Sequence, residues 1–220
     1  MSLSLLYCDD DLAVCEKPVG VSSESPGLPE MVRDRYGFSV LPVHRLDRTT
    51  GGAVVLARNP RSCAALQRLF LSDQVVKEYL AVVSGVPDSP SGSYTDLLYH
   101  DRRSNKTFVV DKPRKGVKEA FCEWAVLETA DTAEGPLSLV RVSLHTGRTH
   151  QIRVQFASRH MPLAGDRRYG SRVRADAPAL WSVRIRFSHP FSAEKAVDAS
   201  SAPPPSFPWS LFPQSLTTDH

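Results

Sequence analysis

The sequence lacks any long uninterrupted apolar segment. No hydrophobic run among its 220 residues approaches the roughly 18 residues of a membrane-spanning helix, because charged residues interrupt every candidate. The first 14 residues, MSLSLLYCDDDLAV, place no basic side chain before their apolar stretch and three acids directly after it. A secretory signal peptide needs a basic start, so we expect neither secretion nor a membrane partner.

Cysteine is also scarce. The four cysteines, Cys8, Cys15, Cys63 and Cys122, lie far apart and form no C-x-x-C pair. This spacing argues against both a zinc site and a disulfide framework, and it favours the reducing cytoplasm as the compartment.

The composition is close to the average for globular proteins. Hydrophobic residues make up 41% of the chain and charged residues 23%, which is enough apolar material to form a core. Wholesale disorder, collagen and coiled coil are therefore excluded. The length fits either one large domain or two small ones packed together.

Positive charge is concentrated in two parts of the chain. Residues 102–118, the first basic window, carry seven basic side chains and one acidic side chain. Residues 141–186, the second basic window, carry ten arginines and two acidic side chains. The net charges of the two windows are +6 and +8, whereas the remaining 10 basic and 21 acidic residues give a net charge of −11. Such polarisation is typical of proteins that bind nucleic acid, although two solvated basic faces would give the same counts.

Short apolar runs bounded by turn residues predict a fold rich in strands. We expect strands at Leu5–Cys8, Leu12–Cys15, Ala53–Ala57, Tyr79–Val83, Phe108–Val110, Ala120–Val126, Leu139–Leu144 and Val183–Phe187. Two helices are predicted, one starting at Asn59 and Pro60 and the other near Thr149. Strands outnumber helices without strict alternation, which favours an α+β class with a mixed, mostly antiparallel central sheet and flanking helices.

The C-terminal end differs in composition from the rest. Residues 196–220 hold five of the 17 prolines, which predicts an extended tail after a domain spanning residues 1–195. Trp209, Leu211 and Phe212 are apolar, so we expect this tail to pack back on the body.

One segment combines an acid with two arginines in a turn. Asp47 lies between Arg45 and Arg48, and Thr49-Thr50-Gly51-Gly52 leads into a buried strand. Nearby cations keep a carboxylate ionised, as a nucleophile requires, and glycine lets the backbone approach a ligand. An ordinary turn whose Asp and Thr bond to the local backbone is the alternative.

Two further segments carry polar groups of interest. Residues 144–153 place cationic, amide and hydroxyl groups together at the start of a predicted helix, where a phosphate could bind. A capped helix with a solvated polar face would have the same sequence pattern. Tyr79, beside Lys77 and Glu78, lies at the mouth of a strand, where its ring could stack on a base. A core tyrosine with its hydroxyl at the surface is the more common case.

Five segments, in order, resemble the motifs of the RluA-type pseudouridine synthases. They are K-P-x-G at 17–20, H-R-L-D-x-x-T-x-G at 44–52, K-x-Y-x-A at 77–81, G-R-T-H-Q-I-R at 147–153 and P-x-x-G-D-x-x-Y-G at 162–170. The agreement in order and spacing runs from about residue 12 to 190. Since the first motif begins at residue 17, the chain resembles the short members that lack an S4-type RNA-binding module.

This resemblance implies an isomerase that converts uridines of structured RNA, either tRNA or ribosomal RNA, to pseudouridine. It implies a catalytic domain of two lobes around one cleft and no cofactor or metal, and a monomer is the default expectation. Asp47 would be the catalytic carboxylate, Tyr79 would pack against the base and handle protons, and Arg153 would pair with Asp47. Arg45 would enter the RNA stack in place of the flipped nucleotide.

The remaining RNA-binding side chains implied by these motifs are His44, Arg148, His150 and Gln151. The basic windows would then supply phosphate contacts, which set affinity without reading sequence.

Two departures from the family pattern concern the wall of the pocket. Gly51 stands where the family usually has Ser, and Leu180-Trp181-Ser182 stands where it commonly shows L-H-A. Two other functions stay open: a catalytically inactive RNA-binding protein on the same scaffold, and an Asp-nucleophile hydrolase of small substrates, which would not need the basic windows.

Overall fold

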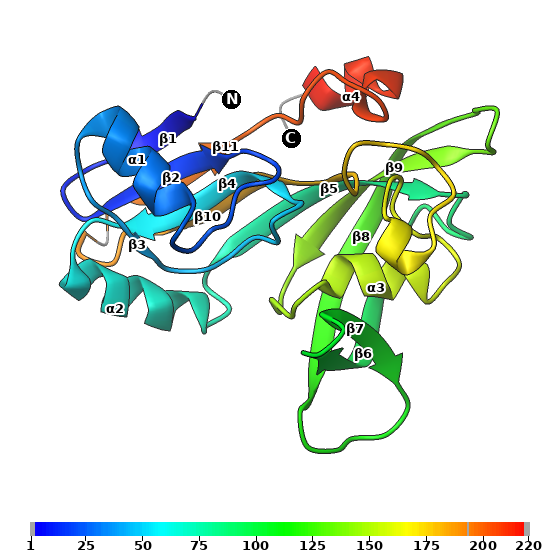
Figure 1. Cartoon of the computed structure of the whole chain (residues 1–220), viewed down its shortest axis with the longest axis horizontal. Coiled ribbons are helices and arrows are strands. Elements are labelled where there is room, and N and C mark those ends of the chain that lie inside the picture. The colour runs from blue at the N-terminus through cyan, green and yellow to red at the C-terminus, as the bar shows by residue number, and fades with distance from the viewer. Residues whose placement is uncertain (1–2, 193, 218–220) are drawn as a thin grey trace. The chain divides into compact units, whose positions relative to one another are not determined.

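The computed structural model describes residues 3–192 and 194–217 (Figure 1). The chain divides into two compact units, one formed by residues 1–78 and 181–203 and the other by residues 79–180 and 204–220. Both units consist mainly of antiparallel strands with few helices, which confirms the predicted α+β class.

The first unit is a sheet with two helices. Its elements are β1 (Ser4–Cys8), β2 (Leu12–Lys17), α1 (Leu28–Tyr36), β3 (Leu41–Pro42), β4 (Gly51–Ala57), α2 (Pro60–Phe70), β10 (Leu180–Ser188, whose first residue belongs to the second unit) and β11 (Ala196–Ser200). The strands follow the order β1-β2-β4-β10-β11, and β3 pairs with the end of β4. Only the β4–β10 pair among them is parallel.

The core of the first unit lies between its sheet and α2. All seven residues of β4 are buried, as expected for a central strand of small and branched side chains. The predicted helix start is confirmed, since the Asn59 side chain accepts a hydrogen bond from the Ser62 backbone N–H at 2.8 Å and Pro60 is the first helical residue. Leu66 and Phe70 then face the sheet on one side of the helix.

The second unit is an antiparallel sheet with one buried helix. Its elements are β5 (Val76–Ser84, whose first three residues belong to the first unit), β6 (Ser91–Asp101), β7 (Lys106–Val110), β8 (Val117–Ala130), β9 (Leu137–Leu144), α3 (Gln151–Ala157), η1 (Arg167–Tyr169), η2 (Trp209–Leu211) and α4 (Pro213–Thr217). The strand order is β5-β9-β8-β6-β7.

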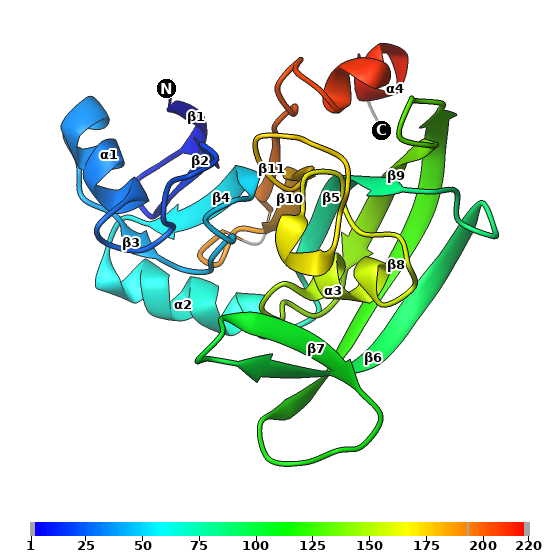
Figure 2. The ribbon, with the colours of Figure 1, turned by 45° about the vertical axis from the view of Figure 1, so that its right-hand side comes forward.

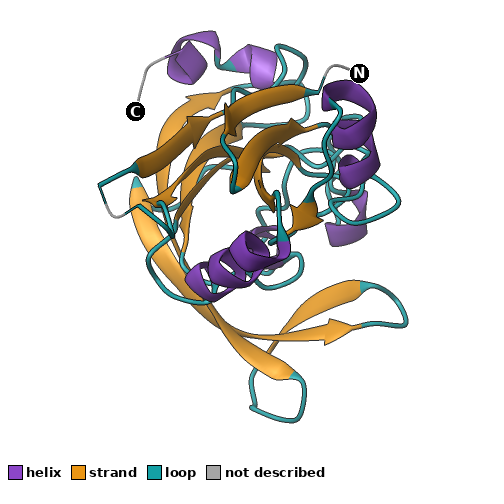
Figure 3. Cartoon of the chain, turned by 90° about the vertical axis from the view of Figure 1, so that its left-hand side faces the viewer, coloured by secondary structure: helices purple, strands orange, loops and turns teal. Residues whose placement is uncertain are grey.

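Helix α3 packs against β6 and β7, as Figure 2 shows. Six of its seven residues are buried, and Val154 contacts Leu98 of β6 and Ala120 of β8. The predicted strand Ala120–Val126 lies within β8, where Ala120, Cys122 and Trp124 are buried and Val126 is half-buried. The hairpin of β6 and β7 projects from the other strands at the bottom of Figure 3.

The segment expected to be a tail contains further regular structure. Ala196–Ser200 forms β11, which pairs with β10, and Val197 and Ala199 are part of the first unit's core. Further along this segment, Trp209 and Phe212 are also buried. The boundary between residues 195 and 196 stays a prediction.

Candidate functional site

The loop that carries Asp47 is held by its backbone. Ser23, which is buried, accepts a hydrogen bond from the Leu46 N–H at 3.0 Å through Oγ and donates one to the Leu46 carbonyl. The Arg48 carbonyl accepts from the Gly20 N–H at 2.8 Å, and Arg48 Nε donates to the Gly20 carbonyl at 2.7 Å. The residues on both sides of Asp47 are thus fixed, which limits the positions open to its carboxylate.

A buried lysine lies in the same part of the first unit. Lys17 has no exposed surface, and its ammonium donates to the carbonyls of Pro18 and Val21 at 3.0 and 2.8 Å. Burial lowers the pKa of Lys17 to about 8, and the Asp47 carboxylate opposes that shift by stabilising the charged form. The pairing of Lys17 with Gly52 across β2 and β4 explains why these two motifs meet.

We expect the Asp47→Asn substitution to lower the pKa of Lys17 below its value of about 8, because it removes the opposing charge. Titration of the lysine side-chain signals by NMR measures this pKa. Asp10→Asn is the control, since the Asp10 side chain is fully exposed. An unchanged Lys17 pKa in Asp47→Asn would contradict the electrostatic pairing of Lys17 with Asp47.

The same shift gives the sign of the pH dependence of stability. Between pH 8 and 10.5 the unfolded chain keeps the Lys17 proton that the folded chain has lost. The contribution of Lys17 to the free energy of unfolding therefore rises with pH across this window.

His44 and Arg45 have different environments within the loop. His44 Nε2 accepts a hydrogen bond from the Val55 N–H at 2.9 Å, and its ring stacks on Phe70 at 4.3 Å. Burial, with the nearby Lys77 charge, lowers the pKa of His44 to about 3, so the ring is neutral. These contacts support a structural role for His44. Arg45 is exposed and lies 3.7 Å from the exposed Glu24 carboxylate, a pair that water screens.

The two departures from the family pattern lie against each other. Trp181 is paired with Gly51 across the parallel strands β4 and β10. A Cβ atom on Gly51 would lie 2.7 Å from Cη2 and 2.8 Å from Cε3 of the Trp181 indole. Only glycine therefore fits beside this ring. Trp181 Nε1 donates to Ser201 Oγ at 3.0 Å, and Ser201 donates to the Glu16 carboxylate at 2.8 Å.

In the second unit, the last two motifs meet at an ion pair. Arg153 donates to the Asp166 carboxylate through Nε at 2.7 Å and through Nη2 at 2.9 Å, and both side chains are buried. The guanidinium also lies 5.2 Å from the ring centre of Tyr169. Such two-point pairing holds a buried guanidinium in one orientation.

Tyr169 extends this cluster. Its hydroxyl accepts a hydrogen bond from the Thr107 N–H and lies 2.9 Å from His150 Nδ1, and burial raises its pKa. Asp166 and Tyr169 are not among the predicted site residues. Both belong to the P-x-x-G-D-x-x-Y-G motif, which was the sequence feature that could have identified them.

The remaining predicted residues of the second unit make mainly internal contacts. Gln151 Oε1 accepts from Thr146 Oγ1 and from the Arg148 N–H, and its amide donates to the Phe121 carbonyl. Arg148 Nε donates to the Glu119 carbonyl at 2.9 Å. Tyr79 lies on β5 with 7% of its surface exposed. Their roles toward RNA stay predictions.

The first basic window spans the β6–β7 turn, β7, the loop that follows it and the first two residues of β8. Six of its basic side chains are exposed: Arg102, Arg103, Lys112, Arg114, Lys115 and Lys118. None of them forms an ion pair with any residue that the structure describes. The second window is partly neutralised, because ion pairs form at Arg153, Arg159, Arg184 and Arg186.

The described residues contain no group of three or more His, Cys, Asp or Glu side chains that could hold a metal ion. Within the same residues, no helix is long and apolar enough to span a membrane.

Comparison with known proteins defines the class. Residues 11–158 match the family described as RNA pseudouridylate synthase, so the chain belongs to that family. It is an RNA pseudouridine synthase, an enzyme that isomerises uridine in RNA.

Its relatives have related names. The chain is 33% identical to an uncharacterized RNA pseudouridine synthase of Aquifex aeolicus, over 87% of this chain and 67% of that protein. It is 29% identical to tRNA pseudouridine synthase C of Haemophilus ducreyi, over 89% of each. The structure of human RNA pseudouridylate synthase domain containing 1 matches with a TM-score of 0.80 at 26% identity, covering 96% of this chain and 86% of that one.

Proposed function

We propose that Asp47 is the catalytic carboxylate of this pseudouridine synthase. The observation that carries the proposal is the H-R-L-D loop of a family member, whose backbone is fixed on both sides of Asp47 and whose acid interacts with a buried ammonium. Glycoside hydrolysis uses two carboxylates and a water. Isomerisation retains the detached uracil and uses no water, so that one carboxylate is enough.

Tyr79 and Arg153 complete the proposed chemistry. Tyr79 packs against the target base and handles protons, and Arg153 acts together with Asp47 as the third catalytic residue. The pairing of Arg153 with Asp166 supports this role, because it holds the guanidinium rigidly. Arg45 fills the RNA stack when the uridine flips out, a role that its exposure supports.

The proposed substrate is a uridine in structured RNA, either tRNA or ribosomal RNA. The match to a relative named as a tRNA enzyme supports tRNA as the first substrate to test.

Tritium release from RNA labelled at C5 of uridine tests the proposal, because forming the C5 glycosidic bond expels that hydrogen. The expected result is the release of tritium without the release of free uracil. RNA binding without tritium release would instead identify an inactive RNA-binding protein. Release of free uracil would identify a hydrolase.

RNA affinity should fall steeply with salt. If several of the six exposed cations of the first basic window contact phosphates, the log–log slope of the binding constant against salt should be about −3 or steeper. Charge reversal at Arg102, Arg103, Lys112 or Lys115 should weaken binding of all RNAs similarly and flatten the slope, because phosphate contacts carry no sequence information. Fluorescence anisotropy at several salt concentrations measures both effects, and a flat profile in the wild type would contradict them.

A further inference from the structure

One face of the β6–β7 hairpin is covered by the body of the second unit, and the other face is not. On the covered face, Leu98 and Val109 pack against α3, and Thr107 Oγ1 donates to the Thr149 carbonyl at 2.8 Å. Successive side chains of a strand point to opposite faces. The cross-strand pair Tyr99 and Phe108 therefore lies on the opposite, outer face.

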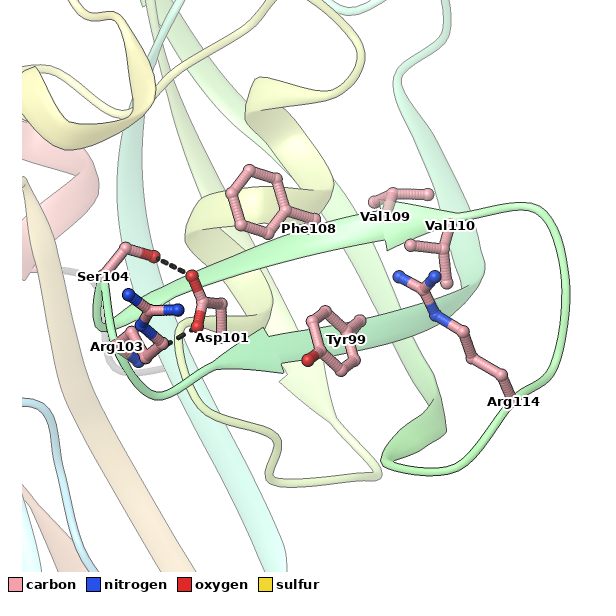
Figure 4. Close-up of a pocket in the computed structure, with 8 residues that line it drawn as sticks. All are labelled: Tyr99, Asp101, Arg103, Ser104, Phe108, Val109, Val110 and Arg114. Atoms are coloured by element: carbon pink, nitrogen blue, oxygen red, sulfur yellow. Dashed lines mark hydrogen bonds between the residues drawn. The ribbon is translucent and has the colours of Figure 1, made fainter.

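The outer face holds an open groove of about 950 Å³ (Figure 4). Its apolar lining includes Tyr99, Phe108 and Val110, and Phe108 has 41% of its surface exposed. Arg103 lies toward one end of the hairpin and Arg114 toward the other.

Both aromatic rings lie close to cations. The Arg114 guanidinium lies 4.8 Å from the ring centre of Tyr99, and the Lys106 ammonium 5.5 Å from that of Phe108. Tyr99 is also covered by the loop after β7, since a Cβ atom on Gly116 would lie 3.6 Å from its ring. Phe108 is thus the ring with the most open surface.

We propose that this groove binds an unpaired nucleotide of the substrate RNA by stacking its base on Phe108. The inference rests on the proposed function, which brings RNA to this protein. An exposed aromatic ring between cations is the combination that binds single-stranded nucleic acid, because every base has a face that can stack and every nucleotide a phosphate.

The charge around the groove favours RNA over a protein as the occupant. Two exposed cations of the first basic window, Arg103 and Arg114, line the groove together with its apolar side chains, and Asp101 is the one acid of the lining. The carboxylate of Asp101 is turned to its own loop, where it accepts from the Arg103 N–H at 2.9 Å and from Ser104 Oγ at 2.7 Å.

The test compares two RNA probes at fixed salt: an unstructured single-stranded 12-mer of mixed sequence and a blunt duplex of equal charge. Phe108→Ala should weaken binding of the single strand by roughly ten-fold or more, and Phe108→Leu by nearly as much, because base stacking needs the ring. Binding of the duplex should stay unchanged. Phe191→Ala is the matched control, since Phe191 is similarly exposed beside the Arg61 guanidinium in the first unit.

Salt dependence separates stacking from charge. Phe108→Ala should leave the salt slope intact, whereas Arg114→Gln should reduce it by about one phosphate contact. Equal losses on both probes, or wild-type affinity in Phe108→Ala with an unchanged melting curve, would overturn the stacking site. Tritium release by the wild type is measured alongside, because its absence would count against the proposed function and not against the groove.

Discussion

Asp47→Asn should abolish pseudouridine formation while leaving the protein folded. The substitution keeps the size and hydrogen-bonding shape of the side chain but removes its charge and most of its nucleophilicity. Since Asp47 is the only acid of the H-R-L-D loop, we expect turnover to fall by at least about a thousand-fold. RNA affinity should stay equal or increase, because a negative charge near phosphates is lost.

Pseudouridine yield on cellular RNA, a melting curve and RNA affinity are the three measurements for this variant. Asp10→Asn changes the same side chain at an exposed position of the first unit and should behave as wild type. Substantial isomerase activity in folded Asp47→Asn would remove Asp47 as the catalytic residue.

Elements with a strong local signal were predicted well from the sequence. The start of α2 has both an Asn cap and a Pro at the first position, and the structure shows both in use. Strand β4 was recognisable because every residue from Ala53 to Ala57 is apolar.

Elements with weak patterns were missed for identifiable reasons. β6 begins Ser91-Gly92-Ser93, and only Tyr94 and Leu98 are buried along it, because the strand runs into an exposed hairpin. α1 buries only three residues, Leu28, Pro29 and Val32, so that its apolar stripe is too short to stand out.

The sequence predicts the residues of the candidate site one by one, but it does not predict their contacts. The motifs named Asp47, Tyr79 and Arg153, whereas the partners seen here come from strand register and tertiary packing. Lys17 reaches the Asp47 loop because β2 pairs with β4, and Trp181 reaches Gly51 because a strand 130 residues later lies beside it. No local sequence pattern predicts these two contacts, because they depend on which strands pair.

The contact between Gly51 and Trp181 predicts that the two departures depend on each other. Gly51→Ser would place a Cβ atom inside the contact distance of the indole. The ring cannot turn away without losing the hydrogen bond of its Nε1 to Ser201. Overpacking of this kind costs about 1–3 kcal/mol of the free energy of unfolding. Because residue 51 follows the Asp47 loop directly, turnover should fall as well.

Trp181→His, the family residue at the other position of the contact, should also destabilise the protein. It leaves a cavity over Gly51 where the buried indole now lies. The double variant Gly51→Ser with Trp181→His carries the family residues at positions 51 and 181, and the smaller ring leaves room for the Ser side chain. We expect its free energy of unfolding to exceed, by at least about 1 kcal/mol, the value obtained by adding the losses of the two single variants. We also expect the double variant to recover turnover. Denaturant unfolding of the four proteins measures this coupling, and Asp10→Asn combined with Trp181→His serves as an uncoupled pair. If the losses in the double variant simply add, the indole does not determine the residue at position 51, and the two departures arose independently.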